Sequence, residues 1–408
     1  MRIDPILTIA FLVLITVLSP LAQSVPSWNQ WRGAGRDGIA AFTPPAVWPE
    51  RPIKRWEASV GLGHASPVVA DGRVYVHTRQ QEREVVSAFD LASGKPLWQD
   101  GYAAPYQMNS AARAHGPGPK STPVVADGRL FTLGISGILS AYEATTGKRL
   151  WRADAPATPP EFGTAMSPVV DGTHLIAHVG GTNKGALTAF DTATGKIAWQ
   201  WPGDGPGYAS PILADIAGTR QVITQTQRFL VGVSRRDGRL LWQLPFTTSY
   251  EQNSVTPLVL GDIVIYSGLD KGTTAVRLVS RGNSWSAEPV WKNEQVSMYM
   301  STAAADDSAI FGFGHRNSGQ FFALDRATGK TLWTTRGREG ENASIVRAGS
   351  LLLLLTTNAE LIVARANAVA YQEVRRYTVA DSPIWAHPAV VGNQVLVKDL
   401  EKLALWAF

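Results

Sequence analysis

The sequence predicts an all-β fold, an eight-bladed β-propeller with four-stranded antiparallel blades, and three observations carry this prediction. An eleven-residue phrase that ends in tryptophan recurs along the 408-residue chain. Aromatic residues at the last position of that phrase continue at intervals of 42 to 53 residues and give eight positions. A second segment, an apolar run broken by a turn, also occurs eight times. Units of this length with four short strands are typical of propeller blades and not of helical solenoids.

The phrase is best explained as architecture. It occurs with small changes at 88–98, 141–151, 189–199 and 323–333. Ala88 is small where a neighbouring blade packs, Asp90 can accept bonds from the amides of the next turn, and Gly94 allows positive φ. Trp98 is expected to bury about 150–250 Å² between adjacent sheets. A structural role needs one copy per blade, so we expect interblade docking by Trp56, Trp98, Trp151, Trp199, Trp242, Trp291, Trp333 and Tyr377.

The second recurrent segment predicts the first hairpin of each blade. Its clear copies start at Ser66, Thr122, Ser167, Ser210 and Thr256, and its weaker copies start at Ser301, Ala343 and His387. In the first unit, Asp-Gly between two apolar runs is a strong hairpin signal. We therefore expect strands at 66–70, 73–78, 85–90 and 96–99.

The two chain ends are predicted to share the last blade. The final residues, 387–408, supply only three strands, and the segment "PIKRWEA" around Trp56 can supply the fourth. Such pairing closes the ring and protects strand edges that would otherwise be exposed. The propeller is thus expected to cover 53–408. Residues 25–52, rich in Pro and Gly, form a lead-in segment that should pack across one face through Trp28, Trp31 and Trp48.

The first 24 residues predict a Sec-type signal peptide, with an apolar run from Ile6 to Leu18 and small residues from Ala22 to Ser24. A retained N-terminal anchor is the alternative. The chain has no cysteine, which removes disulfides, thiolate metal sites and the lipid-attachment residue of a lipoprotein. We expect a monomeric periplasmic or secreted protein without a transmembrane span in the mature chain.

Charge excludes one class of partner. The formal net charge is +5, but Lys and Arg are scattered, with no run longer than a pair such as Arg235-Arg236. Nucleic-acid grooves need clustered positive charge together with stacking platforms. A nucleic-acid partner is therefore not expected.

The phrase A-x-D-x-x-T-G-x-x-x-W resembles the tryptophan-docking repeat of the pyrroloquinoline quinone (PQQ) type propellers. The match is loose at 232–242, where Ser234 replaces the acid, and the units that end at Trp291 and Tyr377 are degenerate. The lead-in "WNQWRGAGRDG" is similar to the start of bacterial PQQ-like repeat proteins. This resemblance covers nearly the whole mature chain and implies the eight-bladed fold.

The resemblance implies two different functions. Quinoprotein dehydrogenases hold PQQ with Ca²⁺ in an eight-bladed propeller and use a catalytic aspartate and adjacent cysteines. This chain has no cysteine, and its residues do not identify the calcium ligands or the aspartate, so no catalytic residue is assigned. BamB-type propellers are binding scaffolds of similar length in outer-membrane protein assembly. Their lipid-attachment cysteine is also missing here.

A candidate site lies where the loops that enter the innermost strands converge at one mouth of the ring. The polar and aromatic residues of those loops are His64, His115, Lys120, Glu161, Tyr208, Tyr250, Glu251, Tyr299, Glu341, Asn342, Trp385 and His387. They predict a site for a small molecule or an envelope protein. The alternative is a wet channel that binds only water. A metal site made by His64, His115 and His387 is a further alternative, since imidazoles suit Zn, Cu or Fe.

These observations favour an exported scaffold that binds a ligand or a protein in the cell envelope and has no chemistry of its own. The alternative is a PQQ-dependent alcohol or sugar dehydrogenase that uses the central channel.

Overall fold

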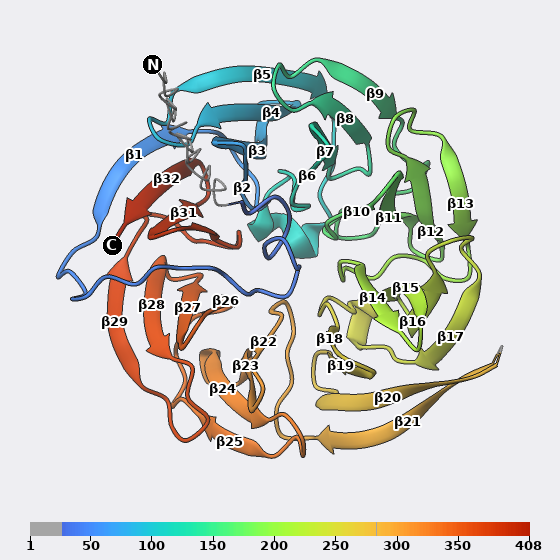
Figure 1. The fold of residues 1–408 in the computed structure, drawn as a ribbon. Coiled ribbons are helices and arrows are strands. Elements are labelled where there is room, and N and C mark those ends of the chain that lie inside the picture. The colour runs from blue at the N-terminus through green and yellow to red at the C-terminus, as the bar shows by residue number, and fades with distance from the viewer. Residues whose placement is uncertain (1–26, 283) are drawn as a thin grey trace, which may run out of the picture.

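The computed structural model describes residues 27–282 and 284–408, which form a ring of eight four-stranded antiparallel sheets (Figure 1). Each sheet is a meander whose first strand lies near the axis and whose last strand lies at the rim. The predicted fold class is confirmed. In the first blade the innermost strand begins two residues later than predicted, at Val68, and the other three strands extend beyond their predicted bounds because their pairing continues further.

The first four blades follow the chain in order. Their strands are β2 (Val68–Ala70), β3 (Arg73–Gln80), β4 (Arg83–Asp90), β5 (Pro96–Ala103); β6 (Val124–Ala126), β7 (Arg129–Leu133), β8 (Leu139–Glu143), β9 (Arg149–Ala153); β10 (Val169–Asp171), β11 (His174–Gly181), β12 (Lys184–Asp191), β13 (Ile197–Trp201); and β14 (Ile212–Ile216), β15 (Thr219–Gln225), β16 (Phe229–Ser234), β17 (Leu240–Pro245).

The next three blades continue this order, and short 3-10 turns occur in the loops. The strands are β18 (Leu258–Leu260), β19 (Ile263–Ser267), β20 (Thr273–Arg281), β21 (Ser284–Asn293); β22 (Ala304–Ala305), β23 (Ala309–Gly314), β24 (Gln320–Asp325), β25 (Thr331–Thr334); and β26 (Ala343–Ala348), β27 (Leu351–Thr356), β28 (Glu360–Arg365), β29 (Glu373–Thr378). The turns are η1 (Ser110–His115), η2 (Ser249–Glu251) and η3 (Arg316–Ser318).

The eighth blade is shared by the two chain ends, as predicted. It contains β30 (Ala389–Val391), β31 (Gln394–Lys398), β32 (Lys402–Ala407) and, at the rim, β1 (Ile53–Ser59). Trp56 of β1 lies opposite Leu405 of β32 in an antiparallel pair. The ring therefore closes without a free edge between its first and last strands.

At six of the eight blades a tryptophan of the outermost strand bonds the next blade. The indole nitrogen of Trp98 donates to the carbonyl of Ala144 in the turn of the second blade, at 2.9 Å. In the same turn Gly147 has φ of +75°, and a Cβ atom there would overlap the Trp98 indole. The glycine is therefore required both for its backbone conformation and for the space that it leaves. Five equivalent bonds, 2.8 to 3.1 Å long, join Trp56 to Leu91, Trp151 to Thr192, Trp199 to Arg235, Trp291 to Arg326 and Trp333 to Asn367.

Two of the eight predicted docking residues bond elsewhere, and the next blade explains each case. Trp242 donates to the side chain of Gln221 in its own blade, at 2.7 Å. The following blade has no phrase turn, because β20 and β21 there form one long hairpin. Tyr377 donates to the carbonyl of Pro49, at 2.8 Å. The eighth blade offers it no turn because the third and fourth strands there come from opposite ends of the chain.

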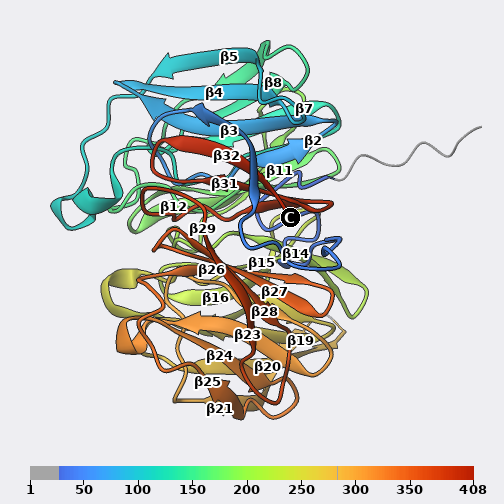
Figure 2. The same ribbon diagram turned by 90° about the vertical axis from the view of Figure 1, so that its left-hand side faces the viewer.

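The lead-in segment covers one face of the ring. Trp28 pairs with Val69 of the first blade through two backbone hydrogen bonds. The segment then crosses to the seventh and eighth blades, and Trp48 packs against Phe42 and Phe408 with centroid distances of 6.1 and 5.9 Å. Figure 2 shows the lead-in, in dark blue, and η1, in teal, on opposite faces.

The predicted signal peptide, residues 1–24, lies outside the described residues. Within 27–282 and 284–408 no helix is long and apolar enough to cross a bilayer.

Candidate functional site

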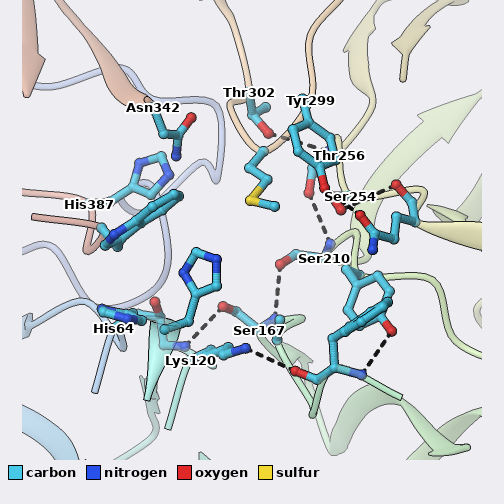
Figure 3. Close-up of a pocket in the computed structure, with 18 of the residues that line it drawn as sticks. His64, Lys120, Ser167, Ser210, Ser254, Thr256, Tyr299, Thr302, Asn342 and His387 are labelled. Carbon is cyan, nitrogen blue, oxygen red and sulfur yellow. Dashed lines mark hydrogen bonds between the residues drawn. The ribbon is translucent and has the colours of Figure 1, made fainter. Parts of the chain in front are cut away.

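A cavity of about 510 Å³ opens at the mouth opposite the lead-in, among the loops that enter the first strand of each blade (Figure 3). Nine of the twelve residues predicted for this mouth line it, namely His64, His115, Lys120, Tyr208, Tyr250, Tyr299, Asn342, Trp385 and His387. They come from seven different loops, so the ring closure alone brings them together. Their role in binding stays a prediction.

The three predicted acids do not line the cavity. Glu161 accepts a hydrogen bond from Asn109, at 3.1 Å, and Glu251 accepts one from Gln227, at 2.9 Å. Glu341 is exposed to solvent. Among the residues that line the cavity there is consequently no carboxylate.

A cluster of imidazole and indole rings forms one wall. The ring of His115 lies edge-on to Trp385, with centroids 4.6 Å apart, and His64 lies 6.1 Å from each of them. Burial, followed by the charge of Lys398, lowers the pKa of His64 to about 3. Burial also lowers the pKa of His115. These imidazoles are therefore neutral at physiological pH.

Lys120 is the single cationic side chain in this lining. Its Nζ donates to the carbonyl of Phe162 across the gap between two loops, at 2.9 Å. Burial lowers the pKa of Lys120 to about 8. The ammonium form still predominates at neutral pH, in a cavity without a compensating carboxylate.

Tyrosines form the opposite wall. The hydroxyl of Tyr208 accepts a bond from the backbone N–H of Phe162, and the hydroxyl of Tyr299 donates to the side-chain oxygen of Gln252. Tyr250, a residue that is 79% exposed, lies at the entrance of the cavity. The cavity is thus amphipathic, with aromatic walls and a few convergent polar groups, as small-molecule sites generally are.

Sequence reasoning missed a ring of hydroxyl groups at the start of the innermost strands. Each hydroxyl accepts a bond from the backbone N–H of a residue one blade earlier. The series runs from His387 to Ser66, Ser66 to Thr122, Thr122 to Ser167, Ser167 to Ser210, Ser210 to Thr256 and Thr256 to Thr302, with lengths of 2.8 to 3.3 Å. All six hydroxyl residues line the cavity. The signal was present in the sequence, because Ser or Thr begins each clear hairpin segment.

The lead-in contributes Trp31 to the lining. Its ring centroid lies 5.5 Å from the guanidinium carbons of both Arg32 and Arg36, and 5.4 Å from the ring of His387. Both arginines are buried and donate to backbone carbonyls of the residues directly before β22 and β10. Burial lowers the pKa of Arg32 to about 10 and that of Arg36 to about 9, so both stay charged at neutral pH.

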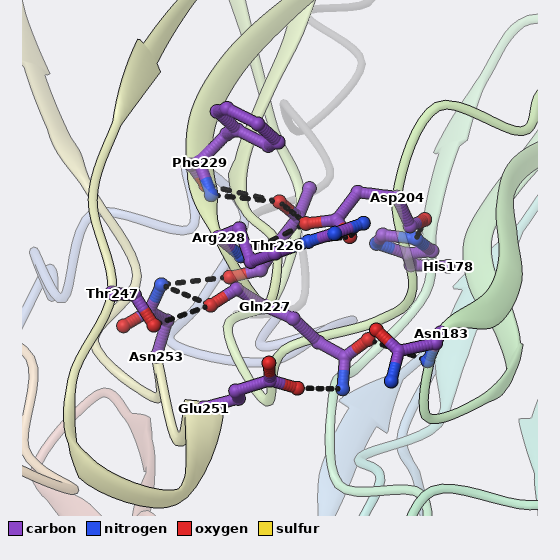
Figure 4. Close-up of polar contacts among 10 residues, drawn as sticks. All are labelled: His178, Asn183, Asp204, Thr226, Gln227, Arg228, Phe229, Thr247, Glu251 and Asn253. Atoms are coloured by element: carbon purple, nitrogen blue, oxygen red, sulfur yellow. Dashed lines mark hydrogen bonds and ion pairs between the residues drawn. The ribbon is translucent and has the colours of Figure 1, made fainter.

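A polar network beside the cavity fixes two of its loops and explains the position of Glu251 (Figure 4). The buried carboxylate of Asp204 accepts bonds from the Arg228 side chain, at 2.6 and 2.9 Å, and from the Thr226 hydroxyl, at 2.7 Å. The neighbouring Gln227 donates to Glu251. The Glu251 carboxylate therefore links two loops by this hydrogen bond and does not line the cavity.

The three histidines do not form a metal centre within the part of the chain that the structure describes. No group of three or more His, Cys, Asp or Glu residues there has an arrangement that could hold a metal ion. Trp385 packs against both His64 and His115, and His387 packs against Trp31.

Fold and cavity together define a closed propeller whose channel is covered at one end by the lead-in and open at the other. The chain belongs to the family described as outer membrane protein assembly factor BamB, whose model matches residues 81–335.

Two kinds of relatives match the chain. The chain is 24% identical over 305 residues to the outer membrane protein assembly factor BamB of Shewanella oneidensis, covering 69% of this chain and 70% of that protein. It is 32% identical over 146 residues to the dehydrogenase subunit of a quinone alcohol dehydrogenase of Acetobacter aceti. That second match covers 34% of this chain and only 19% of the relative.

Solved structures of both kinds share the fold. BamB from Moraxella catarrhalis aligns with a TM-score of 0.63 at 15% identity, over 88% of this chain and 98% of that one. A europium-containing methanol dehydrogenase aligns with a TM-score of 0.59 at 15% identity, over 94% and 98%.

Proposed function

We propose that this chain is an exported propeller of the cell envelope that acts as a binding scaffold, with a ligand or partner site at the open mouth. The observation that carries this proposal is the lining of the cavity, which combines aromatic walls, a ring of hydroxyls and Lys120 without a carboxylate. Such a lining can bind and orient a ligand. It offers no pair of acid and base with separated pKa values.

The similarity to BamB supports an envelope location and a binding role. It covers more than two thirds of both chains, whereas the dehydrogenase similarity covers about a fifth of the enzyme. The predicted signal peptide supports export. We therefore expect a periplasmic or secreted protein whose mouth contacts a small molecule or a segment of another envelope protein.

The quinoprotein alternative rests on the 32% identity to the quinone alcohol dehydrogenase. Ca²⁺ takes six to eight oxygen ligands, and Asp or Glu usually supplies several of them. The described residues around the cavity supply hydroxyls, imidazoles, two side-chain amides and a lysine. Glu161 and Glu251 are engaged elsewhere, and Glu341 is exposed and outside the lining. These residues do not fit a calcium-bound quinone, so we derive no reaction step through it.

One experiment separates the two functions. Purified protein is mixed with PQQ and Ca²⁺, and the quinone absorbance and dye-linked alcohol oxidation are measured. We expect no turnover. Saturable PQQ binding accompanied by alcohol oxidation would establish the dehydrogenase and refute the scaffold.

A second experiment tests the mouth as the binding surface. The tagged protein is crosslinked in envelope preparations, and the recovered partners are compared among the wild type, Tyr299→Ala and Trp385→Ala. We expect both variants to lose partners, while Leu97→Ala at the rim retains them. Equal recovery by all four proteins would place binding elsewhere.

A further inference from the structure

The hydroxyl ring at the base of the cavity has an unused bonding capacity. A hydroxyl has one proton to donate and can accept two bonds. Each of the six accepts the N–H of a neighbouring blade, and within 27–282 and 284–408 none of them donates to a protein acceptor. Six donors therefore converge on one cavity. Figure 3 labels Ser167, Ser210, Thr256 and Thr302 of this ring.

Two further buried nitrogens at the same cavity lack partners. Among the described residues, Nε2 of His64 and Nδ1 of His387 have no hydrogen-bond partner. Both residues line the cavity. A buried polar atom without a partner costs free energy, so a ligand that bonds these atoms would recover it.

Positive charge also lies next to two residues of the hydroxyl ring. Arg32 donates to the carbonyls of Thr302 and Ala303, and Arg36 donates to those of Ser167 and Pro168. Within the described part of the chain neither guanidinium forms an ion pair with a carboxylate, although the nearby charge of Asp37 opposes the effect of burial on the pKa of Arg32. Two ring residues thus carry a guanidinium on the carbonyl side and a free hydroxyl proton on the cavity side.

The cavity adds a third cation, Lys120, and its lining has no acid. Buried charges are normally paired, and hydrogen bonds between ionised partners are stronger than neutral ones. A ligand that brings a negative charge would accept hydrogen bonds from Lys120 and from the hydroxyl ring together, and the charges of Arg32 and Arg36 next to the ring would favour it. The aromatic walls, with Trp31 and Trp385, require that the rest of this ligand be flat and apolar.

We propose that the cavity binds a small organic anion with an oxyanion head and an aromatic body, without a metal ion. The head accepts hydrogen bonds from the hydroxyl ring and from Lys120, and the body lies between the indoles and the tyrosines. Carboxylate and phosphate heads share this chemistry. The inference rests on the proposed binding function and names its ligand class.

The test is isothermal titration in EDTA with three naphthalene compounds, namely 1-naphthoate, 1-naphthyl phosphate and neutral 1-naphthylmethanol. We expect saturable one-to-one binding of at least one anion and at least tenfold weaker binding of the alcohol. The anion that binds more tightly identifies the head group. Equal binding of the alcohol, binding that EDTA abolishes, or no binding of either anion would overturn the proposal.

Matched variants locate the anion. Lys120→Met should weaken anion binding by about tenfold or more, since it removes a charged donor, while Lys120→Arg restores much of it. Lys196→Met makes the same change at an exposed rim turn and should leave affinity within about twofold. Loss in both methionine variants, or in neither, would contradict the site.

A negative result here is distinguishable from failure of the proposed function. If both anions fail to bind but Trp385→Ala still loses crosslinked partners, the scaffold stands and the anion site is wrong. If anions bind and the crosslinked partners are unaffected, the cavity is a ligand site separate from the partner surface.

Discussion

The outer rim and the open mouth of this propeller differ in how far their residues repeat from blade to blade. At the rim, one device recurs, an indole that bonds a turn of the next blade, and it occurs six times in nearly the same form. At the mouth, apart from the repeated hydroxyl ring, the loops contribute different residues to a single cavity. The repeated indoles therefore hold the blades together, whereas we expect the unrepeated residues of the mouth to decide what binds there. Substitutions at the rim should change stability, and substitutions at the mouth should change binding.

The largest expected effect is at the rim. Trp98→Ala should lower the free energy of unfolding by about 3 kcal/mol, the lower end for buried aromatic truncations because Trp98 is only partly buried. Urea denaturation followed by circular dichroism measures this loss. Below the transition, the variant should bind 1-naphthoate as the wild type does. A large loss of affinity in the folded variant would break the separation between rim and mouth.

A pair of glycine variants isolates the space that the indole needs. Gly147 and Gly128 both have positive φ, at +75° and +70°, but a Cβ on Gly128 meets nothing within 4 Å. Gly128→Ala should cost about 1 kcal/mol for conformation alone. Gly147→Ala should cost about 2 kcal/mol more, because it also displaces Trp98. Thermal denaturation of both variants checks this, and equal costs would show that the turn alone requires glycine.

A smaller effect is expected in the hydroxyl ring. Thr256→Val removes the acceptor of the Ser210 backbone N–H and should cost about 1 kcal/mol of stability, whereas Thr256→Ser should be nearly neutral. The same valine variant should weaken 1-naphthoate binding about fivefold, and the serine variant should not. Urea denaturation and titration calorimetry provide the two readouts. Stability loss with unchanged affinity would make the ring purely structural.

The pH dependence of anion binding is the finest test. Burial lowers the pKa of Lys120 to about 8, and its protonated form is the one that attracts an anion. Affinity should therefore be full well below pH 8 and should fall above it, by up to about tenfold per pH unit. His64 and His115, whose pKa values are lowered by burial, stay neutral in this range. Burial also lowers the pKa of Lys398 to about 8. The anion affinity of Lys120→Met should therefore still fall with pH in this range, but less steeply than that of the wild type. If the anion affinity of the wild type stays constant from pH 7 to 9, Lys120 is not the cation that binds the anion.

The sequence was sufficient for the blade count because the features of the rim are local. Asp90, Gly94 and Trp98 lie within eleven residues, and their contacts can be inferred from spacing. The exceptions, Trp242 and Tyr377, depend on what the next blade provides, which spacing does not describe.

The mouth could be predicted only in part. Nine of the predicted loop residues line the cavity because every loop into an innermost strand ends at the same mouth. Glu251 does not line it, since the direction of its side chain depends on the network around Gln227. The hydroxyl ring was not predicted, because a position at the start of a hairpin was a sufficient explanation for Ser167 and the equivalent residues. The positions of Arg32 and Arg36 next to these hydroxyls could not be predicted, because they depend on the path that the lead-in takes through the structure.

The most direct test of the account is a crystal structure of the protein grown in EDTA with 4-bromobenzoate. If the cavity is the anion site, we expect one strong bromine anomalous peak inside it, between the aromatic walls. The carboxylate should lie within hydrogen-bond distance of the hydroxyl ring and Lys120. Bromine only at the rim, or a carboxylate that points out of the mouth into solvent, would contradict it.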